Sequence, residues 1–80
     1  MTTSSLTDVL CDLATDVPEV SWPSMVRIAE PDCSEFNLTH ALHAMAGYRD
    51  AVKLGDAKSI VFWHHGLAAA ARRLQVAVVA

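Results

Sequence analysis

Apolar residues recur along the chain at the three- and four-residue spacing of an α-helix, and no segment shows convincing strand-like alternation. The first such run extends from Ser5 to about Asp16, with acidic residues on its opposite side. Ser5 and Asp8 have the spacing of a helix start, and Pro18 ends the helix because proline disfavours helical geometry in the residue before it. The apolar side of this predicted helix comprises Leu6, Val9, Leu10, Leu13 and Val17.

A second, shorter helix is predicted between the next two prolines. It begins around Ser21, with Pro23 in the first turn, where a missing amide hydrogen leaves no helical bond unmade. It ends near Glu30, because Pro31 steers the preceding residue out of the helical region. Its apolar face comprises Trp22, Met25, Val26 and Ala29.

The second half of the chain predicts an antiparallel helical hairpin. Cap candidates at residues 32–35 begin a long helix that ends at about Leu54, where Gly55 has the usual place of a C-terminal glycine. Asp56 caps the last helix, which is expected to continue to about Val78. A connection this short makes the two helices antiparallel neighbours.

The longer hairpin helix carries two apolar strips, so we expect it to be the central helix and to be covered on most sides. The first strip comprises Leu38, Ala41, Leu42, Met45, Tyr48 and Val52. The second comprises Phe36, His40, His43, Gly47, Ala51 and Leu54. The last helix has one main stripe, which comprises Ile60, Trp63, Leu67, Ala70, Ala71, Leu74 and Val78.

Two glycines lie inside the predicted hairpin helices. Residues that face each other across the turn have numbers summing to about 111, which sets Gly47 near the level of Gly66. Glycine costs up to about 1 kcal/mol relative to alanine inside a helix, so a close approach of the two backbones is a physical reason for both. The sequence therefore predicts a tight crossing there and a strong loss of stability in Gly66→Leu.

These elements predict an all-α fold, a small bundle of about four helices with a C-terminal antiparallel hairpin, in which residues 1–80 form a single domain. Hydrophobic residues make up 52% of the chain and charged residues only 19%. A small body with so few charges has too little polar surface to cover itself, so we expect an exposed apolar patch and a tendency to self-associate.

The net charge of −3 is divided unevenly. Residues 1–40 hold seven acidic residues and one base, whereas residues 41–80 hold five bases and two acids. We favour the interpretation that the two halves neutralise each other within one chain. Alternatively, the acidic half binds the basic half of a second copy head to tail, or the chain is an adaptor that binds two unlike partners. Binding to nucleic acid is not expected, because it depends chiefly on an excess of Lys and Arg.

The two cysteines show no C-x-x-C or zinc-finger spacing, and residues 1–7 do not resemble a secretory signal, so we expect free thiols and a cytoplasmic location. No membrane association is expected. The most apolar stretch, residues 60–71, contains two histidines and is shorter than the roughly 20 residues that a membrane span requires.

The four histidines are weak candidates for a metal or haem site, since three imidazoles from the two hairpin helices could approach one ion. They are His40, His43, His64 and His65. The ordinary interpretation is half-buried histidines that are hydrogen-bonded locally. No cofactor is therefore expected.

Catalysis is not expected either, because no nucleophile elbow, zinc-protease motif or glycine-rich phosphate loop occurs in the chain. A helix-turn-helix DNA-binding regulator is an alternative, in which Asn37, Thr39 and His40 could touch bases. Its weakness is that the predicted recognition helix has no Lys or Arg before Arg49.

The function that the sequence favours is a non-catalytic protein–protein interaction module. Such a regulator, adaptor or inhibitor docks a helical surface on a larger protein, as a monomer or as a homo-oligomer. The predicted partner-binding residues are Phe62, Arg72, Arg73, Val76 and Val79. Phe62 falls outside the main stripe of its helix, and aromatic residues are favoured in interfaces. The apolar C-terminus, residues 76–80, is either part of that interface or a last helical turn that packs on the first helix.

Overall fold

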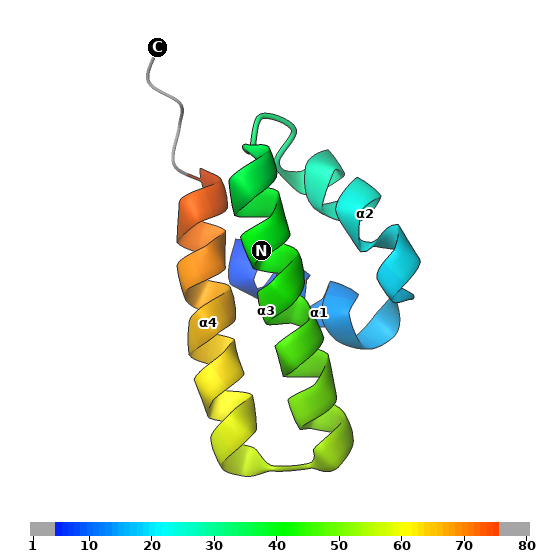
Figure 1. Cartoon of the computed structure of the whole chain (residues 1–80), viewed down its shortest axis with the longest axis vertical. Coiled ribbons are helices and arrows are strands. Elements are labelled where there is room, and N and C mark those ends of the chain that lie inside the picture. Colours follow the sequence, from blue (N-terminus) through cyan, green and yellow to red (C-terminus); the bar gives the residue numbers. More distant parts are fainter. Residues whose placement is uncertain (1–4, 76–80) are drawn as a thin grey trace, which may run out of the picture.

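The fold is all-α. The computed structural model describes residues 5–75, and within this range it contains four α-helices, one short 3₁₀ segment and no strand (Figure 1). The elements are α1 (Leu6–Asp16), η1 (Glu19–Ser21), α2 (Trp22–Ala29), α3 (Glu35–Leu54) and α4 (Ala57–Gln75). The predicted small bundle of about four helices with a C-terminal hairpin is thus confirmed. None of these helices is long and apolar enough to cross a membrane.

The ends of the helices follow the local signals in the sequence. The Ser5 hydroxyl accepts a hydrogen bond from the backbone N–H of Asp8 at 3.2 Å and begins α1. In the same way the Ser34 hydroxyl accepts from the N–H of Asn37 at 3.1 Å and begins α3. Gly55 ends α3 in the left-handed conformation, with φ of 70°, which glycine adopts without steric cost.

The chain between α1 and α2 differs from the prediction. Residues Glu19–Ser21 form the 3₁₀ turn η1, and the backbone of Ser21 is already helical. The Ser21 side chain therefore makes no capping hydrogen bond, and α2 continues directly from η1.

At the start of α4, the Asp56 carboxylate accepts a hydrogen bond from the Ser59 hydroxyl at 2.6 Å.

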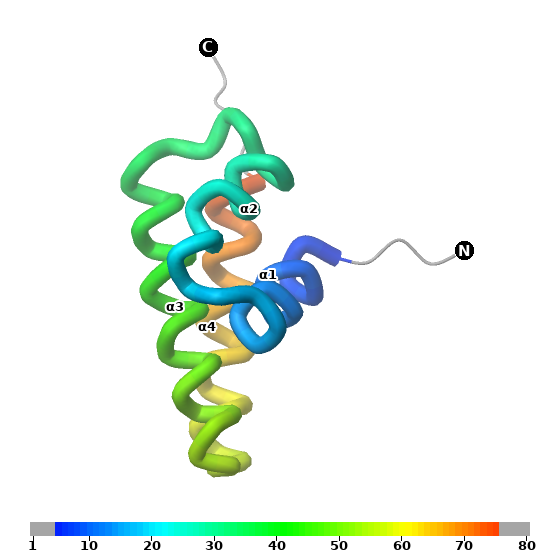
Figure 2. The backbone as a smooth tube through the Cα atoms, turned by 90° about the vertical axis from the view of Figure 1, so that its right-hand side faces the viewer, coloured from blue at the N-terminus to red at the C-terminus, as the bar shows by residue number. Residues whose placement is uncertain are grey.

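α3 and α4 form a long antiparallel hairpin, and the shorter helices cover only part of it. In Figure 1, α1 lies behind the hairpin and α2 lies beside α3. Figure 2, turned by 90°, shows α1 crossing one face of the hairpin, while the turn between α3 and α4 extends well past it. In the part of the chain that the structure describes, one face of the hairpin and its turn end therefore have no covering helix.

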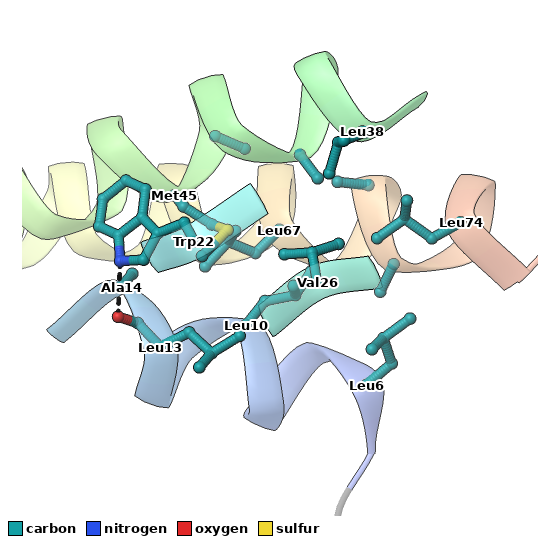
Figure 3. Packing of buried hydrophobic residues seen from close by; sticks show 14 residues of the cluster. Leu6, Leu10, Leu13, Ala14, Trp22, Val26, Leu38, Met45, Leu67 and Leu74 are labelled. Atoms are coloured by element: carbon teal, nitrogen blue, oxygen red, sulfur yellow. Dashed lines mark hydrogen bonds between the residues drawn. The ribbon is translucent and has the colours of Figure 1, made fainter. Parts of the chain in front are cut away.

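The core forms where α1 and α2 meet the hairpin (Figure 3). Its largest fully buried side chains are Trp22, Leu10, Met45, Leu67 and Val26. The buried apolar cluster is completed by Leu6, Leu13, Ala14, Leu38, Ala41, Ala44, Ala70, Ala71 and Leu74. Four helices thus share one core, to which α4 contributes two leucines and two alanines.

Trp22 joins three elements of this core. Its ring N–H donates to the backbone carbonyl of Leu13 at 2.9 Å (Figure 3). It also donates to the carbonyl of Val17 at 2.8 Å, just after the end of α1. The guanidinium of Arg49, on α3, lies 5.1 Å from the centre of the same ring. Arg49 also forms an ion pair with Glu19 of η1. The chain reversal between α1 and α2 is in this way fixed against α3.

Candidate functional site

The expectation that α3 is covered on most sides is wrong. The first apolar strip is largely buried or half-buried, although Val52 is 39% exposed. In the second strip Ala51 is buried, but Phe36 is 72% exposed and Leu54 is 81% exposed. The physical reason is that α1 and α2 both lie on the side of the hairpin that carries the first strip. The second strip faces away from them, and no helix within residues 5–75 covers it.

Three aromatic rings line up beside this uncovered strip. Trp63 of α4 is half-buried, and its ring centre lies 6.0 Å from that of His43 and 5.3 Å from that of Phe62, both in edge-to-face geometry. Phe62 is 66% exposed. Edge-to-face pairs of this kind stabilise the orientation of each ring. The rings therefore form a fixed aromatic ridge between the two helices of the hairpin.

Gly47 makes room for this ridge. A Cβ atom added to Gly47 would lie only 2.5 Å from three ring carbons of Trp63. The predicted crossing of two backbones at Gly47 and Gly66 is therefore wrong: the close approach is between the Trp63 ring and Gly47. A Cβ at Gly66 would meet only one ring carbon of Trp63, at 3.8 Å, so the strong destabilisation predicted for Gly66→Leu is no longer expected.

We call the exposed apolar surface of the hairpin the hairpin strip. It comprises Phe36, His43 and Leu54 of α3 together with Phe62 and Trp63 of α4. The α3 members are seven and eleven residues apart, close to whole numbers of helical turns, so they lie on one side of the helix. Exposed apolar surface of this extent is typical of interaction sites.

Charge on α4 is entirely positive. The helix contains no acidic residue, and Lys58, Arg72 and Arg73 are all exposed. α1 is the reverse, with three exposed aspartates and no base. Among residues 5–75 only one ion pair, between Arg49 and Glu19, joins the acidic half of the chain to the basic half. Neutralisation within the chain, which we favoured from the sequence, is therefore slight in this part of the structure.

The predicted partner-binding residues fall into two groups. Phe62, Arg72 and Arg73 are exposed on α4, as an interface requires, and their role stays a prediction. Val76 and Val79 lie outside the described residues, so their part in an interface stays a prediction as well.

A second apolar surface, on η1 and α2, was not predicted. Val20 is 86% exposed, Ile28 is 75% exposed and Met25 is 38% exposed. The sequence placed Met25 and Ala29 on the buried face, but α2 is short and contacts the core mainly through Trp22 and Val26. The signal that could have revealed this surface is Ile28, an apolar residue on the side expected to be polar.

The four histidines do not converge. The ring of His43 faces Trp63, whereas the ring of His64 lies 6.4 Å from that of Tyr48. His65 is exposed and His40 is half-buried. Within residues 5–75 no three His, Cys, Asp or Glu side chains are close enough together to hold a metal ion. A three-imidazole site across the hairpin therefore does not form in this structure.

The residues proposed to touch DNA are also partly engaged in the fold. The Asn37 side chain donates a hydrogen bond to the backbone carbonyl of Arg73 at 3.3 Å, which ties the start of α3 to the end of α4. Thr39 is exposed and His40 is half-buried. The exposed side of α3 near them carries Glu35, whose charge disfavours phosphate.

The cysteines are free thiols in half-buried positions. Burial raises the pKa of the Cys11 thiol above its ordinary value of 9.0, a hydrogen bond with Tyr48 lowers it, and the carboxylates of Asp8 and Asp12 raise it further. The net direction is upward, so the thiol keeps its proton at neutral pH. A protonated thiol is a poor nucleophile.

A cavity of about 330 Å³ lies between the end of α1 and α3. It is lined by Ala14, Thr15, Asp16, Val17, Pro18, Glu19, Arg49 and Lys53. This lining offers two carboxylates and two cations but neither a thiol nor an imidazole. Of the two cations, Arg49 forms ion pairs with Glu19 and Asp50, which neutralise its charge. The pair of Arg49 with Glu19 therefore joins η1 to α3 at this cavity.

The raised pKa of Cys11 predicts a loss of stability at alkaline pH. The folded protein holds this proton more tightly than the unfolded chain does, so the free energy of unfolding falls as pH rises past 9.0. We expect Cys11→Ala to show a shallower fall than the wild type. Thermal unfolding at several pH values between about 7 and 10 measures both slopes. Equal slopes would show that Cys11 does not contribute.

Comparisons of the chain with protein-family models, with curated proteins and with solved structures found no significant match. The indications of function therefore come from the chain's own surface and charges.

Proposed function

We propose that this chain is a non-catalytic protein–protein interaction module of the cytoplasm, a small regulator, adaptor or inhibitor. It docks a helical surface on another protein, as a monomer or as a homodimer. The observation that carries the proposal is the hairpin strip. Its three most exposed members, Phe36, Leu54 and Phe62, are all more than 60% exposed on one side of the hairpin. Leaving such side chains in water costs about 1.5–3 kcal/mol each relative to burial.

The order of the rings supports docking rather than chance exposure. Phe62 and His43 are held in edge-to-face contact with Trp63, which rests on Gly47. A preorganised aromatic surface loses little conformational entropy when a partner covers it. The positive charge of Lys58, one helical turn before Phe62 on α4, adds selectivity for one orientation of the partner.

The test is site-specific photo-crosslinking in the native host. A photoreactive residue replaces Phe62 in one variant and Ile28, on the exposed α2 surface, in a matched control. We expect discrete protein adducts from position 62 in clear excess over position 28. The mass of each adduct shows whether the partner is a larger protein or a second copy of 8.6 kDa. Equal, diffuse labelling from both positions would contradict the proposal.

A further inference from the structure

The proposed function leaves open which protein covers the hairpin strip. We propose that a second copy of this chain covers it, in a two-fold dimer in which α3 of each copy lies against α4 of the other. This inference rests on the proposed function, since it names the occupant of the same surface. Area, register and charge each support it.

The area of the hairpin face suits a dimer. A helix of about 20 residues is roughly 30 Å long, and two neighbouring helices are together roughly 20 Å wide. The face therefore measures about 600 Å² as a flat surface, before the relief of its side chains is counted. Standard protein interfaces bury about 800 Å² on each partner, so this face alone provides most of what a stable dimer needs.

The register of this dimer sets its aromatic rings against small or aromatic residues. The two-fold axis runs parallel to the helices, so each residue of the second copy lies at the same height as in the first. A residue of α3 therefore faces a residue of α4 in the second copy when their two numbers sum to about 111, as within the hairpin. His43 then lies opposite the small residues Gly66 and Ala69. Phe62 lies opposite the part of α3 where the Trp63 ring of the second copy rests on Gly47, so two aromatic rings meet there. A Cβ added to Gly66 would make ordinary contact, at 3.8 Å, with one ring carbon of Trp63, so this part of α4 is closed by the edge of that ring.

Charge favours this arrangement over the alternative with like helices in contact. The exposed carboxylate of Asp50 on α3 comes near Lys58 on α4 of the second copy, since their numbers sum to 108. In the alternative dimer, α4 packs antiparallel against α4 of the second copy. If Phe62 then lies opposite the small Ala69, Lys58 lies opposite Arg73. That contact places like charges together, which is destabilising.

Sedimentation equilibrium of the full chain tests the dimer. We expect a species of twice 8.6 kDa at protein concentrations up to about 100 µM. Phe62→Ser should raise the dissociation constant by about 30-fold or more, as for a central interface residue. Ile28→Ser is the matched control, because it removes an exposed apolar side chain outside this face, and it should leave the dissociation constant unchanged. A monomer throughout this range, or equal effects of the two variants, would overturn the proposal.

A mixing experiment tests the pairing of α3 with α4. Asp50→Lys places two like-charged pairs in its own dimer, and so does Lys58→Glu, so each variant alone should dimerise more weakly than the wild type. An equimolar mixture restores both opposite-charge pairs in a heterodimer and should recover association close to that of the wild type. If the mixture stays as weak as the separate variants, this arrangement of helices is wrong.

The two proposals fail in different ways. A purified chain that stays monomeric, while position 62 crosslinks to a larger protein in cells, overturns the dimer and leaves the interaction module standing. Absence of specific adducts at position 62, of either mass, overturns both.

Discussion

Replacing Trp22 with alanine is expected to remove about a quarter or more of the free energy of unfolding of the protein. The side chain is 1% exposed and is the largest in the core. Truncation of a buried Trp costs about 3–5 kcal/mol, whereas a domain of 80 residues is stable by roughly 4–12 kcal/mol in total. The loss also separates α1, α2 and Arg49, which all meet at this ring. Urea unfolding followed by far-UV circular dichroism measures the change.

Trp22→Phe is the matched control, because it keeps an aromatic ring and removes the ring N–H. The carbonyl of Leu13 still accepts a hydrogen bond from the Val17 amide, so only the Val17 carbonyl loses its partner. We expect a cost of about 1–3 kcal/mol, smaller than that of alanine. A Trp22→Ala protein with the midpoint of the wild type would show that this ring does not organise the core.

Gly47→Leu is expected to destabilise the hairpin by about 1–3 kcal/mol, which in a domain of this size lowers the Tm by roughly 5–20 °C. The reason is steric, because even a Cβ atom at this position would lie 2.5 Å from the Trp63 ring. The ring must leave its place, and its contacts with His43 and Phe62 are lost with it. Thermal unfolding measures the Tm, and Trp fluorescence reports the displaced ring.

Gly66→Ala is the control for the gain in helix propensity. Its added Cβ has ordinary contact distance to Trp63, so this variant should be more stable than the wild type by up to about 1 kcal/mol. Equal Tm changes in the two variants would contradict the assignment of Gly47 as the position that accommodates the ring.

Much of the fold could be predicted because helix ends are decided locally. Ser5, Ser34 and Gly55 act through contacts within four residues of themselves, and the structure shows each in the predicted role. The short turn then dictates an antiparallel hairpin. The turn η1 was missed, because it depends on how Trp22 packs under the end of α1, which is a tertiary contact.

The uncovered face of the hairpin could not be predicted from periodicity. Spacing shows that α3 has two apolar strips but not which of them α1 and α2 will cover. The same limit explains the wrong prediction of a backbone crossing at the two glycines. Spacing shows that Gly47 and Gly66 lie at one level of the hairpin, but it does not show that the Trp63 ring lies on Gly47. It explains the histidines too, because two residues at one level can point to opposite faces of a hairpin.

Part of the candidate site was accessible from the sequence. Phe62 was predicted to be exposed because it falls off the main stripe of its helix, and the structure confirms the exposure. Phe36 and Leu54 were expected to be covered, and their exposure identifies the hairpin strip. The α2 surface was missed because a helix of eight residues presents too few positions for a reliable pattern.

Hydroxyl-radical footprinting tests most directly whether a protein covers the hairpin strip. The labelling of Phe36, Leu54 and Phe62 is compared between highly diluted purified protein and concentrated extract of the native host, with Val20 and Ile28 as internal controls. The account predicts that labelling of the three strip residues falls together, severalfold, while the two controls change little. Strip residues that stay as strongly labelled as Ile28 under both conditions would show that nothing docks there.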